Sequence, residues 1–272
     1  MKRSSVTLAV SMALTATAAY CQTPAAKAAP SSSAIPRAAD GRPDLSGVWW
    51  RGADVGGKGP GAPVSTAAAQ GKQGQAKAAP PVTFPSLYNA EAQAKAKTLA
   101  DKDDPSLNCT STAFGTLNVS MFDVGAVAQI VQTPKFMIFL SETYNGFQIV
   151  PFDGRPHRDA VPPANRGDAV GRWDGDVFVV DKNNFTDTSW ISAEGRVSFH
   201  SDAMHTVERY RMIDANTLEI EATVEDSKVL TKPWVVPKQT LVRAPFDQIM
   251  ELNCSGAETL SLIEGAAKAA KK

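Results

Sequence analysis

The fold is decided by two stretches, AVGRWDGDVFVVD at residues 169–181 and VERYRMIDANTLEIEATV at residues 207–224. In each stretch two β-rich runs flank a short polar turn, at Asp174-Gly175 in the first and at residues 214–217 in the second. An Asp-Gly pair between such runs is a strong signal for a β-hairpin. Because hairpins this short leave no room for crossover helices, the pattern argues against Rossmann-like and TIM-barrel folds.

Further apolar, β-rich runs lie on both sides of these stretches, separated by turn residues such as Asn145-Gly146. Residues 87–100 are rich in Ala, Glu and Lys, which favour a helix that Asp104-Pro105 ends. Strands are expected at 44–50, 126–132, 136–141, 147–152, 169–173, 177–181, 207–213, 218–224, 235–243 and 249–254.

So many sequential strands rarely remain an open sheet, because open sheets leave unpaired edges. We therefore predict a mainly β fold, an antiparallel meander closed into a lipocalin-like barrel, with a β-sandwich as the alternative. One N-terminal helix and a short C-terminal helix would complete it.

The N-terminus has the three parts of a secretory signal peptide. Lys2-Arg3 is positively charged, residues 6–19 are apolar but too short to span a bilayer, and small residues follow. We expect cleavage and export to the periplasm or exterior of a Gram-negative bacterium. The expected organisation is a signal peptide at 1–20, a flexible tether at 21–43, a strand joined to the core at 44–50, a disordered Gly/Ala/Pro-rich loop at 51–82, a barrel domain at 83–256 and a C-terminal helix or tail at 257–272.

If such a signal peptide is removed, Cys109 and Cys254 are the only pair of cysteines certain to remain, because Cys21 lies next to the predicted cleavage site. In an oxidising compartment they predict a disulfide bond, and there is no CxxC pattern to favour redox or metal chemistry. A bridge that closes so long a loop stabilises a protein by roughly 4–5 kcal/mol in chain-entropy estimates.

The charge balance narrows the range of partners. The chain has 28 basic and 28 acidic residues, and neither a basic stripe for nucleic acid nor a polybasic patch for anionic lipid is present. We expect no nucleic-acid partner and no transmembrane segment, and a small-molecule ligand is the partner that remains. The sequence contains no signal for the oligomeric state.

Five blocks of sequence resemble a large group of exported bacterial proteins of unknown function. The resemblance implies a secreted β-rich domain and brings no reaction with it. The blocks are DGRPDLSGVW at 40–49, DDPSLNC at 103–109, DGRPH at 153–157, GRWDGD at 171–176 and SDAMHTVERY at 201–210.

Two histidines are the candidate acid–base groups, because a histidine side chain titrates near neutral pH. His157 ends the turn block at 153–157, and His205 begins a strand in which Glu208 falls on the opposite face. The candidate catalytic residues are His157, His205, Glu208 and Asp153. Arg155 and Arg209 are candidates to hold an anionic or carbonyl group, and Tyr144, Trp173 and Trp190 to line an apolar pocket. The histidine spacing matches no metal motif, so neither a metal nor a cofactor is expected.

Three functions stay open on this basis. The first is an exported barrel that binds a small apolar or aromatic ligand in its interior or mouth. The second is a periplasmic barrel enzyme, an isomerase, lyase or hydrolase, that uses His157 and His205 for acid–base chemistry. The third is a structural module of the cell envelope.

Overall fold

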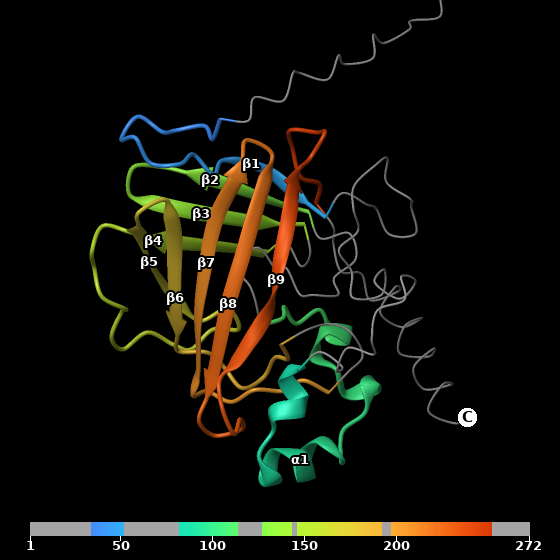
Figure 1. Ribbon diagram of the computed structural model, residues 1–272. Coiled ribbons are helices and arrows are strands. Elements are labelled where there is room, and N and C mark those ends of the chain that lie inside the picture. The colour runs from blue at the N-terminus through green and yellow to red at the C-terminus, as the bar shows by residue number, and fades with distance from the viewer. Residues whose placement is uncertain (1–33, 52–81, 114–126, 143–145, 192–196, 252–272) are drawn as a thin grey trace, which may run out of the picture. The chain divides into compact units, whose positions relative to one another are not determined.

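Alternating apolar residues form nine antiparallel strands in the computed structural model, which describes residues 34–51, 82–113, 127–142, 146–191 and 197–251 (Figure 1). The strands within these ranges are β1 (Gly47–Trp50), β2 (Ala128–Gln132), β3 (Phe136–Ser141), β4 (Gly146–Pro151), β5 (Asp168–Asp174), β6 (Val177–Asn183), β7 (Met204–Asp214), β8 (Thr217–Asp226) and β9 (Trp234–Arg243).

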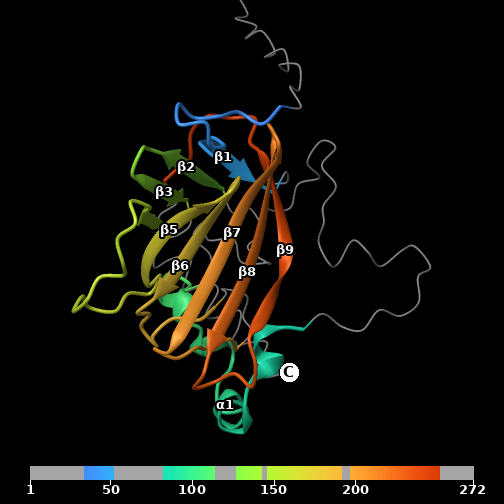
Figure 2. The ribbon, with the colours of Figure 1, turned by 60° about the vertical axis from the view of Figure 1, so that its left-hand side comes forward.

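The sheet is an antiparallel meander that curves into a nearly closed ring. Every strand pairs with its neighbour in sequence except β4 and β5, and β9 returns to pair with β1. The sheet is therefore a nearly closed barrel, as the curvature in Figure 2 shows, and the predicted barrel is confirmed over the alternative sandwich. Strands β4 and β5 contact each other without a described hydrogen-bond ladder, and we call this join the seam.

The hairpin turns form where the sequence predicts them. Strands β5 and β6 are joined by Gly175 and Asp176, and Gly175 has a φ of +58°, which glycine adopts without a steric penalty. Strands β7 and β8 are joined through Asp214, whose side chain accepts hydrogen bonds from the backbone of Asn216 and the hydroxyl of Thr217.

Two clusters of buried apolar residues lie inside the barrel. The first includes Trp49, Phe139, Phe178 and Tyr210, which are at most 1 % exposed. The second lies toward the helix-bearing end of the barrel and includes Phe84, Tyr88, Phe185 and Trp234. Strand β7 runs from one cluster to the other, because its inward residues begin with Met204 of the second and end with Met212 of the first.

The helix predicted at 87–100 is shorter and begins later. Helix α1 spans Ala90–Ala96, because the Asn89 side chain caps its first turn by accepting a hydrogen bond from the Ala92 amide. At its other end the backbone N–H groups of Thr98 and Leu99 donate to the carbonyls three residues earlier, Lys95 and Ala96, so the α-helical pattern ends there. Short 3₁₀ segments lie on either side, at Phe84–Leu87, Asp101–Asp103 and Pro105–Asn108.

Two further boundaries differ from the prediction. The described part of the predicted tether, residues 34–43, lies on the barrel, because the Arg37 guanidinium forms an ion pair with Asp176 at 2.7 Å and Ile35 packs on the first cluster. Residues 249–251 are not a strand, although one was expected at 249–254.

Several predicted features lie outside the described residues. They are the signal peptide, most of the loop at 51–82, Cys254 and the C-terminal helix at 257–272. None of the described helices is long and apolar enough to cross a membrane.

Trp49 lies in β1, the strand that connects β2 to β9, so loss of its side chain should be costly. Trp49 is fully buried, its indole N–H donates to the Leu45 carbonyl, and its strand joins β2 to β9. We expect Trp49→Ala to lower the free energy of unfolding by about 3–5 kcal/mol. Urea unfolding followed by circular dichroism measures this loss. Trp50→Ala is the control, because Trp50 is only partly buried, and equal losses in the two variants would contradict this account of closure.

Candidate functional site

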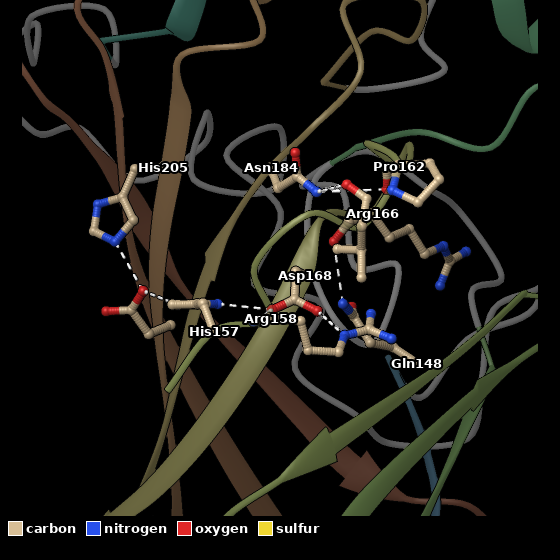
Figure 3. Close-up of polar contacts among 10 residues, drawn as sticks. Gln148, His157, Arg158, Pro162, Arg166, Asp168, Asn184 and His205 are labelled. Atoms are coloured by element: carbon tan, nitrogen blue, oxygen red, sulfur yellow. Dashed lines mark hydrogen bonds and ion pairs between the residues drawn. The ribbon is translucent and has the colours of Figure 1, made fainter. Parts of the chain in front are cut away.

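The structure brings the two candidate histidines together through a residue that the sequence analysis did not select. Asp181 Oδ1 lies 3.0 Å from His157 Nε2 and 3.0 Å from His205 Nε2 (Figure 3). The other ring nitrogen of His157, Nδ1, lies 3.0 Å from Asp168 Oδ2. We call His157, Asp168, Asp181 and His205 the histidine cluster.

The cluster lies on the outside of the barrel and not in its mouth. His205 and Asp181 occupy outward positions of β7 and β6, whereas their neighbours Thr206 and Lys182 point inward and are fully buried. His157 reaches them from the connection between β4 and β5, after the turn that contains Gly154, with its φ of +85°. The cluster therefore attaches that connection to the outer face of β6 and β7.

Asp168 is the buried anchor of the cluster. It accepts hydrogen bonds from the Arg158 backbone N–H and from Arg158 Nε, at 3.0 and 2.5 Å. Burial raises the pKa of Asp168, but the hydrogen bonds from Arg158 and His157 outweigh burial and hold it below its usual value. For Asp181, burial likewise acts upward and the two histidines lower its pKa overall.

The ring nitrogens of the cluster face carboxylates. Carboxylates only accept hydrogen bonds, so both contacts of His157 are hydrogen bonds when its ring carries two protons. His205 Nδ1 also faces a carboxylate, Glu225, at 3.5 Å. With its nitrogens engaged in this way, the cluster is better suited to holding a loop than to exchanging protons with a substrate.

A second group of polar residues lies inside the barrel, between the two apolar clusters. We call Gln148, Arg166, Lys182, Thr206 and Glu208 the polar belt. Along β7, the inward residues Thr206 and Glu208 separate Met204 of the second cluster from Tyr210 of the first. All five belt residues are at most 8 % exposed.

One ion pair satisfies the acidic member of the belt. Lys182 Nζ lies 3.1 Å from Glu208 Oε1, and the Tyr210 hydroxyl donates to Glu208 Oε2. Burial lowers the pKa of Lys182, and the negative charge of Glu208 opposes that effect. A buried charge is tolerated only when it is paired and hydrogen-bonded, as this pair is.

Other polar atoms of the belt lack a hydrogen-bond partner. They are Arg166 Nη1 and Nη2, Gln148 Oε1 and Thr206 Oγ1. A buried polar group without a partner costs about 1–3 kcal/mol, and more if it is charged. Native structures rarely retain several such groups side by side unless the groups serve another purpose.

The remaining predicted catalytic residues lie apart from the histidines. Glu208 is inside the barrel, because alternate residues of a strand face opposite ways, and it cannot orient His205. Asp153 forms an exposed ion pair with Arg155, which lowers its pKa to about 2. Arg209 pairs with Asp174 on the outer face, 2.8 Å away.

The predicted pocket aromatics do not form one wall. Trp173 packs on the first apolar cluster and Trp190 is a member of the second. Tyr144 lies outside the described residues, as does Cys254, so the bond from Cys109 stays a prediction.

Sequence reasoning missed Arg158, Arg166, Asp168, Asp181 and Lys182. Lys182 had a signal: it shares the strand parity of the apolar Phe178 and Val180. Arg166 had none, because it lies in the connection that precedes β5. Among the described residues no group of three or more His, Cys, Asp or Glu side chains could hold a metal ion.

No protein-family model, curated protein or solved structure matches this chain. The resemblance to exported bacterial proteins therefore stays a prediction, and the function is inferred from the barrel and its two polar groups.

Because of the histidine cluster, we expect the free energy of unfolding to depend on pH in the acid range. A carboxyl whose pKa is lower in the folded state stabilises fully above its unfolded value, about 3.9, and loses that contribution as the pH falls through the folded value. Asp168 and Asp181 both have lowered pKa values. We expect Asp168→Asn to lower the free energy of unfolding by about 1.5–3 kcal/mol at pH 7. On acidification to pH 3, the free energy of unfolding should fall less for this variant than for the wild type.

Urea unfolding across this pH range measures both effects. Asp174→Asn, an exposed change on the same face of β5, is the control and should have little effect. Parallel pH profiles for Asp168→Asn and the wild type would contradict the assignment.

Proposed function

We propose that this protein is an exported β-barrel that binds a small, largely apolar or aromatic ligand in its interior. The observation that supports the proposal is the polar belt, where buried polar atoms without partners lie between two apolar clusters. Ligand sites are typically apolar surfaces with a few polar groups that fix the ligand's orientation. A ligand that hydrogen-bonds to the belt would offset the cost of burying these groups.

The alternative of an acid–base enzyme has one observation in its favour. Asp181 holds His157 and His205 close together, within the reach that shared proton transfer requires. The occupied ring nitrogens weigh against it, since a general acid or base needs a nitrogen free to reach the reacting atom. Binding is therefore the function that the geometry supports better.

A purely structural envelope module accounts less well for the belt. A barrel with no ligand gains most stability from a fully apolar interior, because replacing buried ion pairs by packed apolar side chains is often neutral or stabilising. Burying the charged side chains of Lys182 and Arg166 would lower the stability of such a module without a benefit to it.

The binding site can be located with a neutral aromatic fluorophore, N-phenyl-1-naphthylamine. We expect its fluorescence to rise on titration with the protein and to saturate at one probe per chain. Ala222→Phe should abolish the rise, because Ala222 is a buried inward residue of β8 opposite Glu208. Thr223→Phe, the next residue and outward-facing, is the matched control and should leave binding intact.

Circular dichroism verifies that both variants are folded. Native mass spectrometry of wild-type protein, purified without denaturation, should also reveal a retained small molecule. Equal probe binding by the two variants would place the probe outside the barrel and contradict the proposal.

Export and the disulfide bond are tested together by intact mass. We expect protein from a periplasmic fraction to lack about the first 20 residues, as signal peptides are removed on export. A peptide digest without reductant should contain Cys109 linked to Cys254, and reductant should separate the two peptides. An unprocessed N-terminus, or both thiols open to alkylation, would contradict these two expectations.

A further inference from the structure

Arg166 is the cationic member of the polar belt whose guanidinium Nη nitrogens lack hydrogen bonds. The two oxygens of Glu208 are engaged by Lys182 and Tyr210. Arg166 Nη1 and Nη2, by contrast, have no hydrogen-bond partner, although the residue is only 8 % exposed. The belt contains two cationic residues, Arg166 and Lys182, and one anionic residue, Glu208. Its net charge is therefore +1.

Two contacts fix the position of Arg166. Its carbonyl accepts a hydrogen bond from Gln148 Nε2, which spans the seam between β4 and β5. Its guanidinium lies against Gly146, where any Cβ atom would overlap it. In Figure 3 the Arg166 side chain extends away from His157 and His205, so it belongs to the interior and not to the histidine cluster.

Arg166 also shares a chain segment with the histidine cluster. Asp168, two residues further on, is held by Arg158 and His157 on the outer face. The cluster thus fixes the end of the connection whose last residues introduce a guanidinium at the seam. A guanidinium fixed in this way is pre-organised for a planar, bidentate anion.

We infer that the barrel interior binds a monocarboxylic acid with an apolar or aromatic body, the carboxylate on Arg166. This inference rests on the proposed binding function and names the ligand's class. The single excess charge matches a monoanion, whereas a phosphate monoester carries close to two negative charges at neutral pH. Thr206 Oγ1 lies in the same belt and is a further donor without a partner.

The carboxylate and the apolar body have separate partners. The guanidinium of Arg166 offers two parallel N–H donors, and the apolar clusters on either side of the belt receive the rest of the molecule. Burial lowers the pKa of Arg166 and the negative charge of Glu208 opposes that effect; an anion in contact with the guanidinium would oppose it further.

The test compares acids with their neutral amides by isothermal titration calorimetry. The probes are decanoate with decanamide, and cinnamate with cinnamamide. We expect each acid to bind the wild type more tightly than its amide. Arg166→Met should weaken the acids about 10- to 100-fold and leave the amides unchanged, the loss expected for one charged hydrogen-bonding partner.

Two further variants separate this effect from misfolding. Gly146→Ala keeps Arg166 but displaces its guanidinium, so acid affinity should fall while amide affinity stays. Arg211→Met removes an exposed arginine paired with Glu219 on the outer face and should change neither. The unfolding temperature of ligand-free Arg166→Met should be no lower than that of the wild type, because the substitution removes a buried guanidinium whose Nη atoms have no hydrogen-bond partner.

The outcomes distinguish the two claims. Amides that bind as tightly as acids, or acids unaffected by Arg166→Met, would overturn the carboxylate assignment and leave the binding function standing. Failure of all four probes to bind would overturn both. In a further outcome, sodium phosphate or chloride raises the unfolding temperature as much as the acids do, and Arg166→Met abolishes that rise. This result would assign the site to an inorganic anion and overturn the organic-acid assignment.

Discussion

The alternation of inward and outward residues along β6 and β7 is the constraint on which the rest of this structure depends. On β7 it places Thr206, Glu208 and Tyr210 inside and His205 and Arg209 outside. A slip of one residue in the pairing of β6 with β7 would expose the apolar set and turn Lys182 toward solvent. The polar belt and the histidine cluster are thus opposite faces of the same two strands.

The polar belt sets stability against function. An apolar interior would cost less than a buried lysine, arginine and glutamate, since ion pairs seldom recover the free energy lost on leaving water. The Lys182–Glu208 pair limits this cost by satisfying both charges, and Tyr210 completes the carboxylate's partners. Under the proposed binding function, Arg166 is the residue of the belt that would give the interior its chemical preference.

Most of the fold could be predicted, because hairpin turns and strand alternation are local properties. The turn after Asp174 and the strand parity of His205 and Glu208 follow from adjacent residues alone. The site could not be predicted in the same way, because Asp181 meets His157 only when a connection folds back over the sheet. Arg166 precedes a strand without any pattern of its own, and its burial depends on the glycine opposite, Gly146.

The ladder that joins β1 to β9 links the two ends of the domain. Arg243 donates to the Ser46 carbonyl across 197 residues of sequence, and Trp49 pairs with Arg243 directly. Contacts so distant along the chain form slowly, because the chain between them loses conformational entropy before the contacts can stabilise it. Pairing of β1 with β9 therefore waits until the ninth strand has been synthesised.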